Sequence, residues 1–101
     1  MKKIQILLVC CHPEISATII RLIDKVEEMA GTAVSSPEEA MISFASRSYD
    51  LVLIGAGLAP EAESQLEAEL KKRQPGIPVV YHFGGGSGLL YTEIRRALNR
   101  N

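Results

Sequence analysis

The fold is decided by one stretch near the middle of the chain, Tyr49-Asp50-Leu51-Val52-Leu53-Ile54-Gly55. Its uninterrupted aliphatic run is typical of a strand that is buried on both faces, and the glycine that follows begins a loop. Similar runs predict a first strand over residues 3–10 and a fourth over residues 77–83. Strands of this kind belong to parallel sheets that helices cover on both faces.

Helical patterns occupy the segments between these strands. Apolar residues recur at spacings of three and four from Pro13 to Met29, which predicts an amphipathic helix that Gly31 ends. A short second strand is then expected over residues 32–35. Because strands and helices alternate with short connections, the strands should run parallel with right-handed crossovers.

Capping residues mark the starts and ends of the later helices. The sequence Ser36-Pro37-Glu38-Glu39 predicts a helix start, with Ser36 as the cap and Glu39 completing a capping box. Another helix is predicted from Pro60 to just before Pro75, with an acidic first turn and a basic last turn that suit the helix dipole. A glycine-rich loop and a final helix over residues 89–99 complete the chain.

Length and composition are those of a single domain over residues 1–101. Hydrophobic residues make up 47% and charged residues 23%, and the formal net charge is -1. Neither nucleic acid nor an anionic membrane surface is expected as a partner, because both require clustered positive charge. The apolar runs are far shorter than the roughly 20 residues of a membrane span. With only the adjacent Cys10 and Cys11, whose pairing would be strained, reduced thiols and a cytoplasmic location are expected.

Several motifs resemble those of bacterial response-regulator receiver domains, over roughly residues 3–84. They are Ile6-Leu7-Leu8-Val9 with the nearby His12-Pro13-Glu14, Ser36-Pro37-Glu38-Glu39-Ala40, the stretch from Tyr49 to Gly55, Pro60, and Ile77-Pro78-Val79-Val80. The resemblance implies a CheY-like, flavodoxin-like three-layer sandwich. Its parallel sheet would have about four strands in the order 2-1-3-4, with helices on both faces. The fifth strand of a receiver has no counterpart, so the domain is expected to be truncated.

The resemblance also implies that the chemistry of the family is absent. Receiver domains bind magnesium through an acidic pair after the first strand and accept a phosphoryl group on an aspartate after the third. In this sequence those positions are occupied by Cys10, Cys11 and Gly55. Receiver domains also carry a hydroxyl residue after the fourth strand, and the matching position here is Phe83. Thiols are poor magnesium ligands, and glycine has no nucleophile. The chain is therefore expected to be a non-catalytic pseudo-receiver that uses no cofactor and serves two-component signalling through a protein partner.

Cys10 supports a second hypothesis. A cysteine between a strand and a helix N-terminus can act as a nucleophile. This part of the chain is similar to the cysteine-phosphorylated B component of the bacterial sugar phosphotransferase system, in which Cys10 would carry the phosphoryl group. Against this, Pro13 lacks a backbone donor and Glu14 would repel phosphate. The simpler interpretation is that Cys10 is a small buried residue at the end of a strand.

A small anion is a third candidate ligand. The run Gly84-Gly85-Gly86-Ser87-Gly88 opens a helix and could present N–H groups to an anion, but it lacks the pattern of a nucleotide-binding fingerprint. A flexible connector is the preferred interpretation of these glycines. The neighbouring cleft would contain His12, Gly57 and His82. The histidines and cysteines are ligand types that zinc accepts, but their spacing is not diagnostic, and no metal site is expected.

The fourth strand is expected to lie at the edge of the sheet. Nothing charged lies between Ile77 and Tyr91, and natural proteins usually cover or charge such an edge. Two arrangements would protect this edge strand from non-specific pairing. Either the glycine segment and the final helix fold over the strand, or a second copy of the chain pairs with it to form a homodimer.

Overall fold

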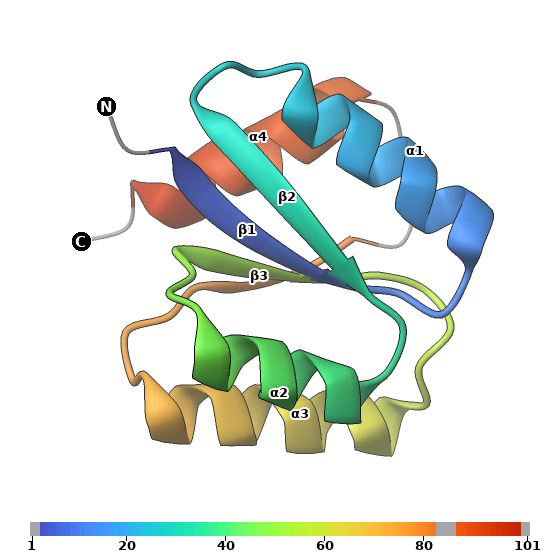
Figure 1. Cartoon of the computed structure of the whole chain (residues 1–101), viewed down its shortest axis with the longest axis vertical. Helices are drawn as coiled ribbons and strands as arrows, with labels where there is room; N and C mark the ends of the chain where they lie inside the picture. The colour runs from blue at the N-terminus through green and yellow to red at the C-terminus, as the bar shows by residue number, and fades with distance from the viewer. Residues whose placement is uncertain (1–2, 83–86, 100–101) are drawn as a thin grey trace.

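Strands and helices alternate along the chain in the computed structural model, which describes residues 3–82 and 87–99 (Figure 1). The strands are β1 (Ile4–Val9), β2 (Met29–Val34), β3 (Leu51–Ile54) and β4 (Val79–Tyr81). The helices are α1 (Pro13–Asp24), α2 (Pro37–Ser46), α3 (Pro60–Arg73) and α4 (Ser87–Leu98). Within these residues no helix is long and apolar enough to cross a lipid bilayer.

The described strands form one parallel sheet in the order β2-β1-β3-β4. β1 lies between β2 and β3, and its register pairs Ile6 with Leu51 and Val9 with Ile54. Residues 6–9 of β1 and all of β3 are buried, as their aliphatic runs predicted. The expected α/β sandwich and its strand order 2-1-3-4 are therefore confirmed.

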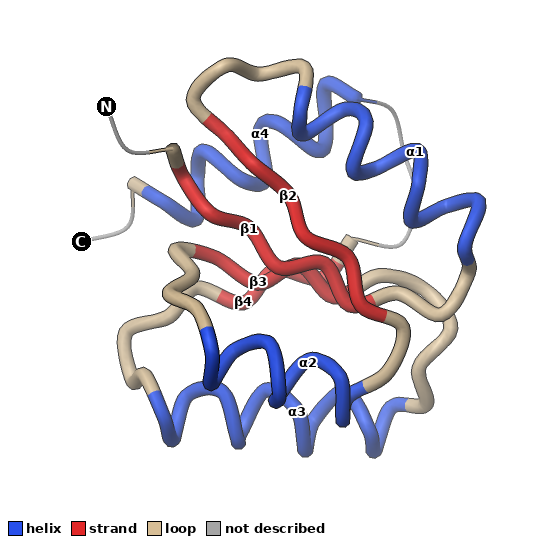
Figure 2. Tube along the Cα trace, in the orientation of Figure 1, coloured by secondary structure: helices blue, strands red, loops and turns tan. Residues whose placement is uncertain are grey.

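Helices cover both faces of this sheet, so two hydrophobic cores form (Figure 2). α1 and α4 enclose the first core, which contains Ile6, Leu8, Ile19, Ile23, Leu90 and Ile94. α2 and α3 enclose the second, which contains Leu7, Val9, Ala40, Phe44, Leu66 and Leu70. Successive residues of β1 serve opposite cores because side chains alternate across a strand. A slip of one residue would exchange the two sets, so the register is strongly specified.

The boundary between α1 and β2 differs from the sequence prediction. α1 ends at Asp24 rather than Met29, and Met29 begins β2, ahead of the predicted start at Thr32. Gly31 lies inside β2, where its N–H donates to the Asp24 carboxylate at 3.1 Å. A Cβ at this position would lie 2.8 Å from Cδ1 of Ile20. The glycine therefore allows α1 to pack closely on the strand and does not end the helix.

The start of α2 follows the predicted capping pattern with one change. The Ser36 hydroxyl accepts a hydrogen bond from the Glu39 N–H at 3.1 Å. The Glu39 carboxylate reaches back to Ser35 instead of Ser36 and accepts from the Ser35 N–H at 2.8 Å and from its hydroxyl at 2.9 Å. The bond from the N–H, and then that from the hydroxyl, holds the pKa of Glu39 below its usual value. These bonds fix the loop that follows β2.

β4 is shorter than the predicted strand over residues 77–83. It spans Val79–Tyr81, although the His82 N–H still donates to the Ile54 carbonyl at 2.9 Å. Among the described residues there is no fifth strand, and β4 forms one edge of the sheet as expected. The chain returns as α4, which packs on the same face as α1 (Figure 1).

A side-chain contact holds α3 over β4. The Tyr81 hydroxyl donates to the Glu67 carboxylate at 2.6 Å, and Glu67 also pairs with Lys71 at 3.0 Å. Burial, and then the adjacent Glu67 carboxylate, raise the pKa of Tyr81 to about 12. The bond from Tyr81, and then that from Lys71, hold the pKa of Glu67 below its usual value.

We expect Tyr81 to stay protonated until the pH reaches about 12. The pKa of Tyr81 in the folded state is above the usual value of about 10, so its stabilising effect is complete below pH 10 and is lost as the pH rises through 12. The phenolate absorbance of the wild type, titrated against that of Tyr81→Phe, measures this group. Glu67→Gln should lower the pKa. Ionisation of wild-type Tyr81 near pH 10 would contradict the contact.

Candidate functional site

Three loops meet at the carboxyl end of the sheet, where parallel α/β sheets commonly bind ligands. They contain Cys10-Cys11-His12 after β1, Gly55-Ala56-Gly57 after β3, and His82 after β4. The Gly55 N–H donates to the Val9 carbonyl at 2.8 Å, and the Cys11 N–H donates to the Ala56 carbonyl at 3.3 Å. The candidate residues that follow β1 and β3 therefore lie together, as the topology of a parallel sheet requires.

Cys10 and Gly55 pack against each other at the centre of this edge. A Cβ at Gly55 would lie 3.1 Å from Cβ and 3.2 Å from Sγ of Cys10, which is tight enough that Cys10 would have to shift. Position 55 thus has no nucleophile, and part of the space that a side chain would need is already filled. The hydrophobic core that α1 and α4 enclose therefore extends to Cys10, at the carboxyl end of β1.

The environment of Cys10 is that of a core thiol. Its side chain is 2% exposed and belongs to the core that α1 and α4 enclose. The thiol lies 3.6 Å from the Ala56 carbonyl and 3.7 Å from the His12 carbonyl, to which it can donate its proton. Both contacts are to backbone carbonyl oxygens of the neighbouring loops.

Cys11 differs from its neighbour in both exposure and direction. Its side chain is exposed, and its thiol donates to the Ser35 carbonyl at 3.3 Å. The two cysteines therefore point to different sides of β1, and both are free thiols.

Gly57 brings the loop after β3 directly against the loop after β1. Its φ of 106° lies in the left-handed region, which favours glycine. A Cβ there would lie 2.7 Å from Cβ of Cys11 and 3.3 Å from the His12 ring atoms Cδ2 and Nε2. The two loops are thus in contact where the sequence predicted a cleft containing His12 and Gly57.

His82 makes a contact that the sequence did not reveal. Its side chain is 6% exposed, and its Nδ1 lies 2.6 Å from a carboxylate oxygen of Glu93 in α4. The pair connects the end of β4 to the final helix across eleven positions of sequence. Because a carboxylate occupies Nδ1, His82 is poorly placed to attract an anion.

The remaining candidate residues belong to the glycine-rich segment. Phe83, Gly84, Gly85 and Gly86 lie outside the described residues, and Ser87 is the first residue of α4. Among the residues that the structure describes, no group of three His, Cys, Asp or Glu side chains is arranged to hold a metal ion. The described histidines and cysteines therefore do not converge into a site of the zinc type.

Asp50 is the acidic residue of the stretch that decides the fold, but it lies at the opposite end of the sheet. It precedes β3, and its carboxylate accepts a hydrogen bond from the Gln5 N–H at 2.8 Å. Gly55 follows the same strand at its carboxyl end. Asp50 therefore lies at the far end of β3 from Gly55.

The architecture is that of receiver domains of known structure. The signal receiver domain of an HD domain-containing protein from Pseudomonas fluorescens superposes with a TM-score of 0.84 at 19% identity, covering 97% of this chain and 88% of that one. A response regulator receiver domain protein from Clostridium thermocellum gives 0.83 at 19% identity, covering 96% and 95%. The response regulator TrrA from Thermotoga maritima, in complex with Mg²⁺ and beryllium fluoride, gives 0.82 at 19% identity, covering 97% and 100%.

Comparison of sequences does not assign the chain to a family. No protein-family model matches the chain, and no curated protein matches it. The structural similarity establishes the fold, and the CheY-like architecture predicted from the sequence motifs is confirmed.

The two thiols should differ strongly in reactivity. Because Cys10 is buried and Cys11 is exposed, a small alkylating agent at neutral pH should modify Cys11 first and Cys10 only slowly. Mass spectrometry of Cys10→Ser and Cys11→Ser, labelled separately, gives the two rates. Unfolding in denaturant should make the rates similar, which provides the control. Fast labelling of Cys10 in the folded protein would contradict its assignment as a core thiol.

Proposed function

We propose that the chain is a receiver-like signalling module that acts by binding a protein partner, without accepting a phosphoryl group and without catalysing a reaction. The observation that carries the proposal is the contact between Cys10 and Gly55. Position 55 has no side-chain oxygen, and a side chain there would need Cys10 to shift. The fold remains complete enough to present surfaces to a partner.

The proposal also holds that the chain has no magnesium site of the receiver type. Magnesium prefers oxygen ligands in near-octahedral geometry, whereas positions 10 and 11 offer thiols. The Cys10 thiol faces carbonyl groups inside the core, and the Cys11 thiol faces the loop after β2. Glu39, in the first turn of α2, is already bound to the N–H and the hydroxyl of Ser35.

The receiver fold supports a place in two-component signalling. The similar structures are described as signal receiver and response regulator proteins. Receiver folds are small platforms whose faces and loops can contact other proteins, and such contacts do not require a phosphoryl group. We place this module in the cytoplasm, where reduced thiols such as Cys10 and Cys11 are the rule.

Acetyl phosphate with magnesium should neither modify the protein nor raise its melting temperature. No described side chain at the carboxyl end of β3 can take the phosphoryl group, and the thiols of positions 10 and 11 are poor magnesium ligands. Intact-mass spectrometry and thermal unfolding are the measurements. Gly55→Asp should also stay unmodified, because Cys10 and Cys11 still occupy the positions of the acidic pair.

The same two measurements, repeated with a phosphohistidine protein as donor and with phosphate alone, separate the proposal from its rivals. A mass gain of one phosphoryl group on wild-type protein, mapped to the carboxyl end of the sheet, would overturn it. If the added group maps to Cys10, and a phosphohistidine protein donates it, the chain is a phosphocysteine carrier. A rise in melting temperature with phosphate alone would instead indicate an anion site at the glycine-rich segment.

A further inference from the structure

A groove runs between α2 and α3, which lie side by side on one face of the sheet (Figure 1). Its volume is about 240 Å³. Pro37, Glu38 and Met41 line it from α2, and Ala62, Leu66 and Glu69 line it from α3. Small-molecule sites usually enclose about 300–1,000 Å³, so this groove is better suited to one or two side chains of a protein partner.

The floor of the groove is apolar. Leu66 belongs to the core that α2 and α3 enclose, and Met41 packs against that core while its side chain remains half-buried. A methionine side chain is unbranched and flexible, so it adapts readily to an incoming apolar group. The groove therefore exposes apolar atoms that the side chain of a partner would cover.

An exposed isoleucine extends this apolar surface onto the outer side of α2. Ile42 is 71% exposed. It is adjacent to Met41 in sequence and four residues after Glu38, and residues four apart are neighbours on a helix surface. A single exposed apolar side chain is ordinary, but apolar surface that continues into a groove is typical of an interaction site.

The charges that border the groove are negative. Glu38 lies in the first turn of α2 and Glu69 lies in the second half of α3, so each helix contributes one exposed carboxylate. Within the part of the chain that the structure describes, neither carboxylate has a hydrogen-bond or ion-pair partner. Two unpaired acids beside an apolar floor are complementary to a segment in which basic residues flank an apolar one.

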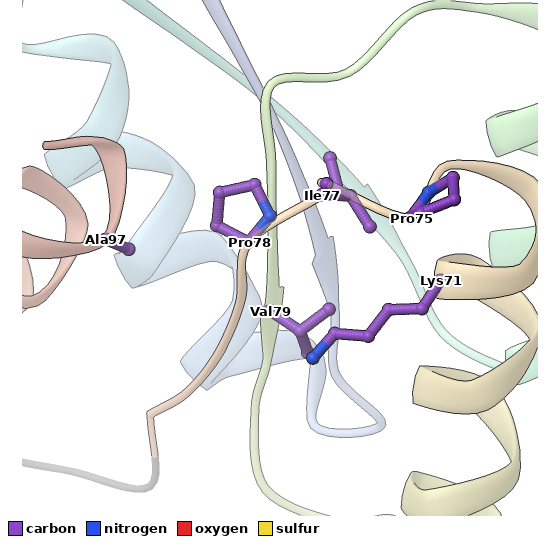
Figure 3. A pocket seen from close by; sticks show the side chains of 7 residues that line it. Lys71, Pro75, Ile77, Pro78, Val79 and Ala97 are labelled. Atoms are coloured by element: carbon purple, nitrogen blue, oxygen red, sulfur yellow. The ribbon is translucent and has the colours of Figure 1, made fainter. Parts of the chain in front are cut away.

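The hollow beside the start of β4 has a different character (Figure 3). The charged residue that lines it is Lys71, which extends from α3 toward Val79. The Lys71 ammonium is already paired with Glu67 at 3.0 Å, and none of the described residues that line this hollow is acidic. Charge complementarity to a basic partner is therefore a property of the groove between α2 and α3.

We propose that this groove binds an amphipathic helix of a protein partner, with an apolar side chain on Met41 and basic side chains beside Glu38 and Glu69. Helix-in-groove recognition uses apolar anchors that recur every three or four residues. Lysine or arginine on both sides of such a row would meet one carboxylate from each helix. The inference rests on the proposed role of the chain as a partner-binding module, and it adds the surface and the chemistry of the partner.

A synthetic helical peptide with one row of leucines, and with lysines at its other positions, is the probe. It should bind the wild type saturably, and its affinity should fall as salt is added, because salt screens exposed charges. The same peptide with glutamates in place of lysines should not bind measurably. In NMR spectra of isotope-labelled methionine methyl groups, Met41 should shift with the bound fraction, while Met29, which is buried in β2, should not.

Matched variants of α2 and α1 separate the groove from the rest of the surface. Glu38→Lys should raise the dissociation constant of the peptide about tenfold, and Ile42→Ser about fivefold. Glu14→Lys and Ile15→Ser make the same changes in α1, on the opposite face of the sheet, and should leave the dissociation constant unchanged. Glu14 follows the first proline of its helix as Glu38 does, and Ile15 is likewise exposed.

Several outcomes would overturn the proposal. They are a lysine peptide that does not bind, a glutamate peptide that binds as tightly, a Met41 methyl that does not move, and α1 variants that weaken binding as much as the α2 variants do. A Met41 resonance that shifts with protein concentration alone would assign the groove to a second copy of this chain and would also overturn it. Each of these results leaves the proposed function standing, because acetyl phosphate tests that function separately.

Discussion

The burial of β1 and β3 on both faces is the constraint on which the rest of the structure depends. Residues 6–9 and 51–54 are withdrawn from solvent, so each connection between strands must place a helix over one face or the other. α1 and α4 cover one face, and α2 and α3 cover the other. This arrangement also determines where β1 and β3 end, and hence which loops meet at the carboxyl edge.

The contact between Cys10 and Gly55 shows how far the same core extends toward the carboxyl edge of the sheet. In a parallel sheet the strand ends are the usual place for polar groups, but here a buried thiol fills the space beside a glycine. Gly57 itself lies close to Cys11 and His12, so the loop after β3 also packs against the loop after β1. The architecture is that of receiver domains, and at its carboxyl edge the end of β1 and the loop after β3 pack against each other.

The sequence predicted those elements whose pattern is set by burial. The runs at β1 and β3 gave the right strands, and Pro60 and Pro75 bounded α3 closely. The predicted end of α1 was wrong because Met29 continues the helical spacing of apolar residues. In the structure Met29 begins the edge strand β2, in which Gly31 leaves room for the Ile20 side chain. Helix propensity and hydrophobic periodicity do not reveal this requirement, because it depends on how α1 packs against β2.

The candidate site was predictable only in part for the same reason. The positions of Cys10, Cys11 and Gly55 at strand ends followed from the parallel topology. The pairing of His82 with Glu93, and that of Tyr81 with Glu67, depend on how α4 and α3 dock on β4, and no local pattern encodes either one. These two contacts connect β4 and the residue after it to the helices on both faces of the sheet.

The most direct test of a receiver fold without a receiver site is an amide NMR titration with magnesium and beryllium fluoride, a mimic of the phosphoryl group. The resonances of Cys10, Cys11, His12, Gly55 and Gly57 should not move, apart from small changes that match those caused by ionic strength alone. Saturable shifts of these resonances, with the rest of the spectrum unchanged, would contradict the proposal that the chain has no phosphoryl or magnesium site.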